Sequence, residues 1–199
     1  MKKTSLFLLL LVSTNLWSKD YIFTADEKFI TSVVDTIKFD GPQIEVYRDA
    51  KVWMVEQKWT ANVTKDSLGE GFEFDVNMVT KARYNPIIRT SYSDYITFVG
   101  TITLKNNLLI LRFDNIQFGE TVKGIGSKSV TQPLAQKIYK MEKEKKARAK
   151  TENDLTMDKK LQKKELAKHD ETIKDIESSL DEVDEELRLK IQLLQKAIQ

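Results

Sequence analysis

Four carboxylates occur together in the segment DSLGEGFEFD, residues 66–75, and three of them, Glu70, Glu73 and Asp75, are the side chains best suited to acid–base chemistry. Glu73 and Asp75 alternate along one face of an expected strand, and Glu70 precedes them. Because glycoside hydrolysis needs only two carboxyl groups at a suitable separation, this pair could serve a hydrolase that acts on cell-envelope glycan. The acids could also form a weak calcium site, but the segment lacks the ligand spacing of an EF-hand. Acids on an exposed strand face are more often solvated surface, so we expect no catalytic residue here and keep the hydrolase as the alternative function.

The rest of the chain offers little for catalysis. His169 is the only histidine, and it lies in a helical segment rather than among the aromatic strands, so a Ser-His-Asp arrangement is not expected. The chain has no cysteine, which excludes thiolate nucleophiles, disulfides, zinc–cysteine clusters and a lipidated cysteine anchor. Residues 119–127 carry glycines spaced as in a phosphate-binding loop, but Ile125 stands where that loop requires lysine. We therefore expect no enzymatic activity, no metal and no cofactor.

Aromatic residues provide a better candidate site. The segment KARYNPIIRTSYSDY, residues 81–95, is expected to be a loop in which aromatic and arginine residues alternate. Such loops are typical of recognition surfaces, and the candidate partner contacts are Tyr84, Arg89, Tyr92 and Tyr95. Trp53 lies at helical spacing from apolar neighbours and is expected in the core, whereas Trp59 lies at the end of the same helix.

The N-terminus has the pattern of a secretory signal peptide. Two lysines precede an apolar run, residues 6–12, and a short polar region closes on Ser18. The run is too short to span a bilayer, so we expect cleavage after Ser18 and no transmembrane anchor in the mature chain. Removal of Lys2 and Lys3 leaves 30 basic residues against 30 acidic ones, and this neutral balance argues against a nucleic-acid partner.

The composition changes sharply along the mature chain. Aromatic and β-branched residues dominate residues 19–118, whereas no Phe, Tyr or Trp occurs after Tyr139. Between the two regions, residues 119–132 are rich in glycine and serine and are expected to be a linker, with Pro133 in the first turn of a helix. The expected organisation is a signal peptide at residues 1–18, a domain at 19–118, a linker at 119–132 and a helical tail at 133–199.

The pattern within residues 19–118 predicts an α+β domain. Expected elements are a strand at 32–39, a helix from about 42 to 58, and a strand at 72–79. A hairpin at 97–118 then turns at Asn106 and Asn107, which tolerate positive φ. This turn pairs Lys105 with Leu108 and places Gly100 opposite Phe113 on an apolar face. The predicted order is β-α-β-β-β, an antiparallel sheet with one packed helix.

Two motifs in this domain resemble a known family. The helix carries EVYRDAKVW, with Tyr47, Arg48, Ala50 and Trp53, and the last hairpin carries a polar turn followed by an arginine and an aromatic residue in YITFVGTITLKNNLLILRFDNI, residues 95–116. Both are similar to a family of secreted bacterial domains of unassigned activity, whose fold is like half of the TATA-binding protein. The resemblance covers residues 30–118. It implies a fold and an exported location, and no catalytic residues.

The tail is expected to be helical and to carry an apolar seam. Its residues are mainly Lys, Glu, Leu, Ala and Gln, without glycine or proline after Pro133. The candidate oligomer seam has alternating three- and four-residue spacings up to Leu187 and continues after one further four-residue step; it consists of Leu166, Ile173, Ile176, Leu180, Val183, Leu187, Ile191, Leu194 and Ile198. Residues 140–168 contain 11 basic and 6 acidic side chains, whereas residues 170–186 contain 9 acidic and 1 basic. These opposed blocks favour antiparallel pairing, either in a hairpin folded near residues 151–158 or between two chains; a solvated helix with ordinary charged faces would explain them equally well.

These observations together predict an exported, non-enzymatic binding or assembly protein of the bacterial envelope, in the periplasm or outside the cell. The α+β domain is expected to carry recognition, and the coiled-coil-like tail oligomerisation or docking. The expected partner is a protein or a second copy of the chain, bound through the tail.

Overall fold

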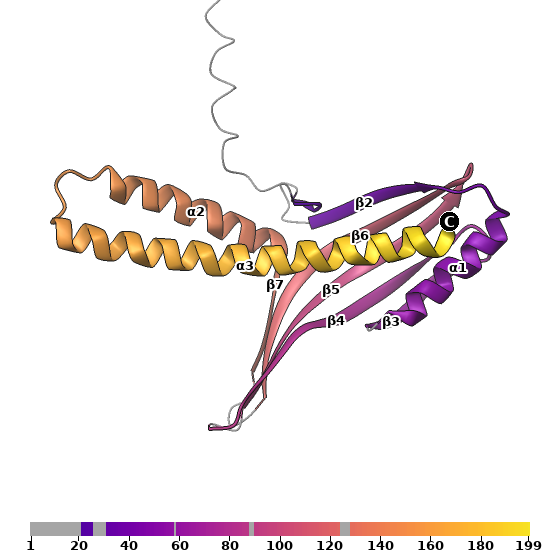
Figure 1. Cartoon of the computed structure of the whole chain (residues 1–199), viewed down its shortest axis with the longest axis horizontal. Helices are drawn as coiled ribbons and strands as arrows, with labels where there is room; N and C mark the ends of the chain where they lie inside the picture. The colour runs from indigo at the N-terminus through magenta and orange to yellow at the C-terminus, as the bar shows by residue number, and fades with distance from the viewer. Residues whose placement is uncertain (1–20, 26–30, 58, 88–89, 124–127) are drawn as a thin grey trace, which may run out of the picture.

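The computed structural model describes residues 21–25, 31–57, 59–87, 90–123 and 128–199, which form an antiparallel sheet with helices on one face (Figure 1). The strands are β1 (Thr24–Ala25), β2 (Thr31–Lys38), β3 (Thr60–Ser67), β4 (Gly71–Asn85), β5 (Thr90–Lys105), β6 (Leu108–Lys123) and β7 (Lys128–Pro133). The helices are α1 (Gln43–Glu56), α2 (Leu134–Glu152) and α3 (Lys159–Ile198). The sheet has the order β1-β2-β6-β5-β4-β3, and β7 pairs with the second half of β6. The α+β class is confirmed.

The hairpin of β5 and β6 has the predicted register. Asn106 and Asn107 form its turn with φ of 53° and 59°. Lys105 pairs with Leu108, and Gly100 pairs with Phe113. Gly100 also pairs with Phe74 on its other side, and a Cβ at this position would overlap the Phe74 ring. The glycine therefore leaves room for two aromatic rings in the core.

Helix α1 packs on the sheet through one face, as predicted. Val46, Ala50, Trp53 and Met54 are all buried, at the spacing of an amphipathic helix. The Trp53 ring lies 6.4 Å from that of Phe74 and 5.4 Å from that of Trp59. Trp53 is therefore a core residue, and Trp59 closes the edge of the same aromatic cluster rather than standing free for a ligand.

Several strands differ from the sequence prediction. β3 was not expected, because its side chains are exposed or only partly buried and show no apolar alternation. The predicted linker, residues 119–132, is strand wherever it is described: Gly119–Lys123 completes β6, and Lys128–Pro133 is β7, paired with it. Backbone pairing thus replaces the expected flexible connection, because its serines and threonines fit a strand as well as they fit a loop.

Helix α3 covers the sheet of its own chain. Ile176, Leu180, Val183, Leu187, Ile191, Leu194 and Ile198 belong to the same buried cluster as the apolar residues of α1, β4, β5 and β6. Ile173 is buried as well, and Leu166 is half-buried. This corrects the expectation of an oligomer seam and of a single packed helix. The apolar stripe is present, but its partner is the sheet that precedes it in the chain.

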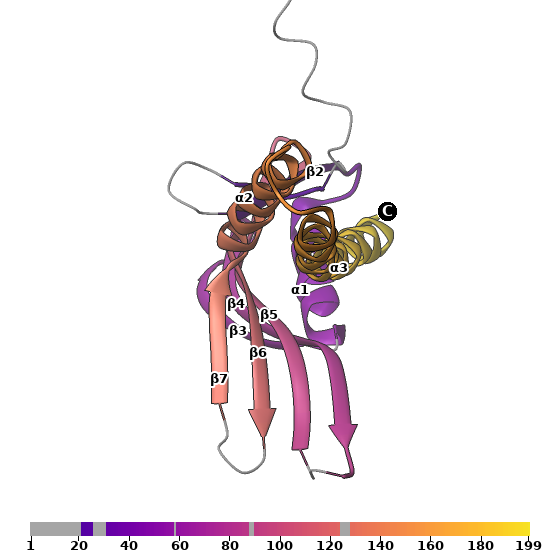
Figure 2. The ribbon, with the colours of Figure 1, turned by 90° about the vertical axis from the view of Figure 1, so that its left-hand side faces the viewer.

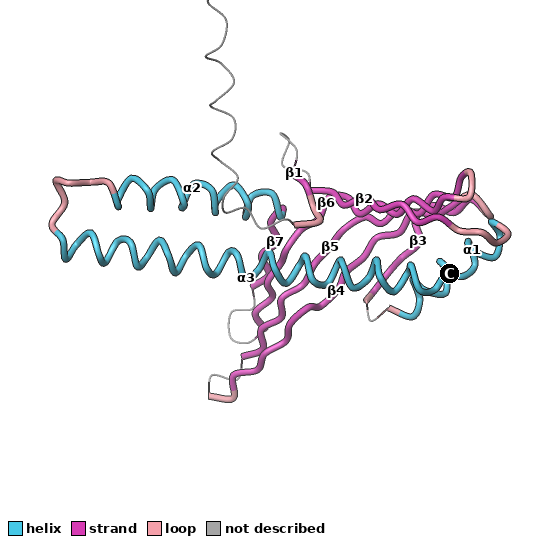
Figure 3. Tube along the Cα trace, turned by 45° about the horizontal axis from the view of Figure 1, so that its top comes forward, coloured by secondary structure: helices cyan, strands magenta, loops and turns pink. Residues whose placement is uncertain are grey.

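Beyond the sheet, α2 and the first half of α3 form an antiparallel hairpin, which we call the arm (Figure 3). Opposite charges join its two helices: Lys145 Nζ lies 2.9 Å from Glu177 Oε1, and Arg148 Nε lies 2.5 Å from Asp170 Oδ1. His169 Nδ1 lies 2.8 Å from Glu144 Oε2. The opposed charge blocks therefore pair within one chain, in the hairpin alternative, with the turn at residues 153–158.

Because the apolar stripe of α3 is already buried, we expect the protein to be a monomer. Light scattering coupled to size-exclusion chromatography should give the mass of one chain at both low and high salt. The intramolecular ion pairs are exposed and contribute little individually, so salt should not change the mass. A dimer that dissociates in salt would instead show that the charge blocks pair between chains.

The first described segment, residues 21–25, lies against α3. Phe23 is buried, Ile22 N donates to Asp184 Oδ1 at 2.7 Å, and Tyr21 Oη donates to Asp181 Oδ1 at 3.2 Å. Burial, and then the Asp181 carboxylate, raise the pKa of Tyr21. The predicted signal peptide lies outside the described residues. Among the described helices, none is long and apolar enough to cross a membrane.

Candidate binding surface

The ends of four strands extend past the helices as a separate part of the sheet, which we call the blade. It consists of residues 79–85 of β4, 90–95 of β5, 117–123 of β6 and 128–133 of β7. Figure 2 shows these strands below α1 and α3, and Figure 1 shows the same part of the sheet without a described helix on it. The base of the blade meets α2, where Phe118 is buried, whereas no described helix lies on the part of the blade farther from the helices (Figure 1).

Irregular pairing marks the start of the blade. The register shifts between Val79 and Lys81 where β4 meets β5, and between Thr97 and Val99 where β5 meets β6. Asn115, in the bulged part of β6, has a φ of 54°. Such bulges bend and twist strands. They direct the strand ends away from the helical layer while backbone pairing continues to the blade's end.

Alternation along the strands divides the blade into two faces. We call the face that continues the helix-covered side the inner face, and the opposite one the outer face. On β5, Tyr92 and Asp94 lie on the inner face, in line with the buried Ile96. Arg83 Nη2 lies 3.3 Å from Asp94 Oδ2 there. Tyr84 and Tyr95 fall on the outer face, together with small and hydroxyl-bearing residues.

Tyr95 lies along the outer face instead of standing up from it. It pairs with Gly119 on β6, and a Cβ at Gly119 would overlap Cε2 and Cζ of the tyrosine ring. The phenol oxygen reaches two hydroxyls on β7: Ser129 Oγ at 3.1 Å and Thr131 Oγ1 at 2.5 Å. The Ser129 hydrogen bond, and then that of Thr131, lower the pKa of Tyr95. The ring thus crosses β6 and is held at both ends.

Further hydroxyls surround this ring. Thr121 Oγ1 lies 3.2 Å from Ser129 Oγ, and Ser91 and Ser93 occupy the outer face of β5. Tyr84, beside Ser91 on the neighbouring strand, is 62% exposed. The outer face of the blade therefore carries the Tyr95 ring, which is held in place by hydrogen bonds, the exposed Tyr84 ring, and several serine and threonine hydroxyl groups.

The structure separates the four predicted contact residues. Tyr84 and Tyr95 share the outer face, Tyr92 lies on the inner face, and Arg89 lies outside the described residues. The segment is not a loop, since both of its sides are strands. The serines and threonines were missed, although the alternation in SYSDY, residues 91–95, and SVT, residues 129–131, was a signal for them.

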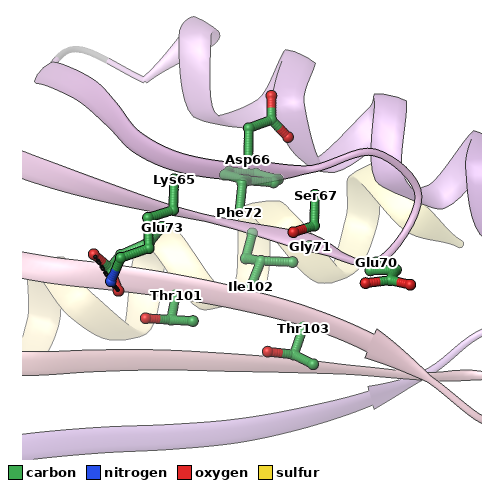
Figure 4. A pocket seen from close by; sticks show the side chains of 10 residues that line it. All are labelled: Lys65, Asp66, Ser67, Glu70, Gly71, Phe72, Glu73, Thr101, Ile102 and Thr103. Atoms are coloured by element: carbon green, nitrogen blue, oxygen red, sulfur yellow. Dashed lines mark hydrogen bonds and ion pairs between the residues drawn. The ribbon is translucent and has the colours of Figure 1, made fainter.

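The carboxylates lie elsewhere, in a shallow depression of about 270 Å³ at the β3–β4 turn (Figure 4). Glu73 and Glu70 line it, and Asp75 does not. Lys65 Nζ lies 3.0 Å from Glu73 Oε2, and the hydrogen bond from Lys65, followed by one from Thr64, lowers the pKa of Glu73. A general acid needs a raised pKa. The setting of Glu73 therefore opposes the acid role that a hydrolase would require, and no three potential metal ligands converge within the described ranges.

Lys137, on α2, was also missed by the sequence analysis. It is buried, its Nζ lies 4.0 Å from the centre of the Phe118 ring, and it is 3.3 Å from Ser179 Oγ. Burial lowers the pKa of Lys137. Its contacts join α2, α3 and β6 at the base of the blade, so we interpret it as a structural junction.

Comparison with known proteins adds two structures. No protein family model and no curated protein matches the chain. A TBP-like protein from Parabacteroides distasonis is similar with a TM-score of 0.48 and 10% identity, over 85% of this chain and 96% of that one. A DUF4468 family protein from Bacteroides ovatus is similar with a TM-score of 0.35 and 9% identity, over 53% of this chain and 63% of that one.

Proposed function

We propose that the chain is a non-enzymatic binding protein, exported to the envelope of a Gram-negative bacterium, that recognises its partner with the outer face of the blade. One observation carries the proposal: Tyr84 and Tyr95 lie together on a sheet face that no described helix covers. Tyrosine supplies a large, rigid contact area at a low cost in conformational entropy, and hydroxyl groups supply adaptable hydrogen bonds. The outer face offers both.

The edges of the blade are less suited to binding than its face. Beyond Asn77, β4 has no strand on its free side among the described residues, so it could in principle accept an added strand. However, Lys81 and Arg83 occupy this edge next to a bulge, and β7 on the other side begins at Lys128 and ends at Pro133. Charges, bulges and proline are the features that discourage strand addition. We therefore assign recognition to the face.

The tail, in this proposal, completes the domain. Its apolar stripe lies on the sheet, so self-association through the tail is no longer needed to bury it. A nucleic-acid partner is not proposed, since the outer face of the blade has too few cations to neutralise phosphates.

Export is supported by the signal-peptide pattern and by the position of the first described segment. Cleavage after Ser18 would keep Tyr21, Ile22 and Phe23, which contact α3, in the mature chain. The helix and hairpin motifs support a further inference of membership in the secreted family with a fold like half of the TATA-binding protein.

Sedimentation with isolated envelopes of a Gram-negative bacterium tests the proposal. We expect the purified protein to sediment with the envelopes, and Tyr84→Ser to bind at least about fivefold more weakly, the ratio for a loss of ~1 kcal/mol at a contact. Val55→Ser is the matched control, because Val55 is 75% exposed on α1, outside the blade. Its binding should equal that of the wild type.

Two results would contradict the proposal. If the wild type does not sediment with the envelopes, the protein has no binding partner there. Equal weakening by Tyr84→Ser and Val55→Ser would mean that the blade is not the contact surface.

A further inference from the structure

The outer face of the blade differs from the rest of the molecule in its charge. In the whole sequence, 31% of residues are charged. Among the described outer-face positions of the blade, Lys123 is the one charged residue, and it lies at the far end of β6; the positions are Val79, Ala82, Tyr84, Ser91, Ser93, Tyr95, Gln117, Gly119, Thr121, Lys123, Ser129, Thr131 and Pro133. A face so poor in charge is complementary to an uncharged partner, because binding there would leave any ionic group without a counter-charge.

The same face is not an apolar patch either. Serine and threonine hydroxyls alternate with the two tyrosines, and each hydroxyl can both donate and accept a hydrogen bond. A hydrophobic peptide or an acyl chain that covered the face would leave unsatisfied the donors and acceptors that these groups do not already use among themselves, at a free-energy cost. The partner must therefore bring many hydroxyl or amide groups of its own.

Tyr95 adds the third requirement. One side of its ring covers Gly119, and its phenol oxygen is held by Ser129 and Thr131, so the other side of the half-buried ring forms part of the outer surface. A ring that lies along a sheet offers its electron-rich face to a flat, weakly positive group. Sugar rings present such a group, because their axial C–H bonds form one flat side while the hydroxyls project from the rim.

The second tyrosine extends the surface in one direction. Tyr84 pairs with Ser91, four residues before Tyr95 on β5, which places the two tyrosines about 14 Å apart along the strands. Ser91 lies beside Tyr84, and Ser93 lies on the outer face between the two tyrosines. The surface is therefore elongated and fits several units of a chain better than one small molecule.

From charge, hydroxyl content and ring orientation together, we infer that the outer face of the blade binds an uncharged glycan chain, with one sugar stacked on Tyr95 and another near Tyr84. The inference rests on the proposed binding function and names the chemistry of its ligand. The neighbouring hydroxyls hydrogen-bond the rim of the stacked sugar.

Gly119→Ala provides a sharp test, since it removes no polar group. The new Cβ would occupy the place of the Tyr95 ring, whose flexible side chain can move, so the fold is kept while the ring is lifted from the sheet. Gly41→Ala is the matched control, because a Cβ there meets nothing within 4 Å. Tyr95→Phe keeps the ring and loses only the hydrogen bonds to Ser129 and Thr131.

The measurement is binding of each purified protein to a glycan array printed with neutral and acidic glycans, with thermal unfolding as the check on folding. We expect the wild type and Gly41→Ala to bind neutral glycans equally. Gly119→Ala should bind them about tenfold more weakly, corresponding to a lost contact of ~1.4 kcal/mol, and Tyr95→Phe within about threefold of the wild type.

The inference is overturned if the wild type binds no neutral glycan on the array, if it binds acidic glycans alone, or if folded Gly119→Ala binds like the wild type. Envelope sedimentation distinguishes a failure of the glycan assignment from a failure of the proposed binding function. If envelopes still bind the wild type through Tyr84, the glycan assignment fails while the binding function stands. If envelopes do not bind it either, both fail.

Discussion

Leu187→Ala is expected to lower the free energy of unfolding by about 2–5 kcal/mol, the usual cost of removing a fully buried leucine side chain. Leu187 is 0% exposed and belongs to the buried cluster that joins α3 to the sheet. Native proteins of this size have only about 5–15 kcal/mol of stability, so the loss is a large fraction of the total. Urea unfolding followed by tryptophan fluorescence measures it, since Trp53 and Trp59 lie in the same cluster.

The control for this prediction lies on the same helix. Leu189 is 45% exposed, and Leu189→Ala should change the free energy of unfolding by no more than about 0.5 kcal/mol. If both substitutions have the same small effect, and Leu187→Ala instead lowers the molecular mass in solution, the apolar stripe of α3 joins different chains. That outcome would restore the oligomer seam.

Gly71→Ala should destabilise the protein by a similar amount, about 2–5 kcal/mol, because a strained backbone and overpacking add. Gly71 has a φ of 147°, a conformation that side chains with a Cβ rarely adopt. A Cβ there would also overlap the carbonyl oxygen of Ile102, a backbone atom that cannot move aside without breaking the pairing of β4 and β5. The midpoint of urea-induced unfolding should move to a lower urea concentration.

Gly41→Ala is the control for Gly71→Ala, and we expect it to change the free energy of unfolding by no more than about 0.5 kcal/mol. Gly41 has open space around it, so it reports the effect of adding a methyl group without a clash. If the two substitutions prove equally mild, the turn before β4 is able to relax, and the tight approach of β4 to β5 at Gly71 is not essential.

The sequence predicted those elements whose residues carry their own local signal. Asn106 and Asn107 specify a turn, and the turn determines the register of β5 and β6. Val46, Ala50 and Trp53 repeat at helical spacing and predicted α1 correctly. In each case, the residues that define the element lie within a few positions of one another.

Elements that depend on distant partners were not predictable in the same way. β3 is an edge strand whose side chains are largely exposed, so Thr60–Ser67 shows no apolar periodicity. Residues 128–133 become a strand only because β6 is available to pair with them. The stripe of α3 was visible, but periodicity shows that a helix has an apolar face and does not show what covers it.

The candidate site depends both on local sequence signals and on pairing with distant segments. Tyr84 and Tyr95 were identified from their residue types, whereas their shared face depends on the register shift between Val79 and Lys81. A shift of one residue exchanges the two faces of a strand, so the sequence alone could not place Tyr84 on the face of Tyr95 rather than on that of Tyr92. The hydroxyls of Ser129 and Thr131 join the site through pairing across β6, from a segment expected to be a linker.

The position of α3 in the chain has a consequence for how the protein folds. This helix supplies much of the layer that covers the sheet, yet it follows every strand in sequence. A ribosome adds about 5–20 residues per second, so the strands are synthesised several seconds before α3. During that time, the part of the sheet that α3 covers in the folded protein remains exposed. Folding is therefore expected to be completed only after synthesis of α3.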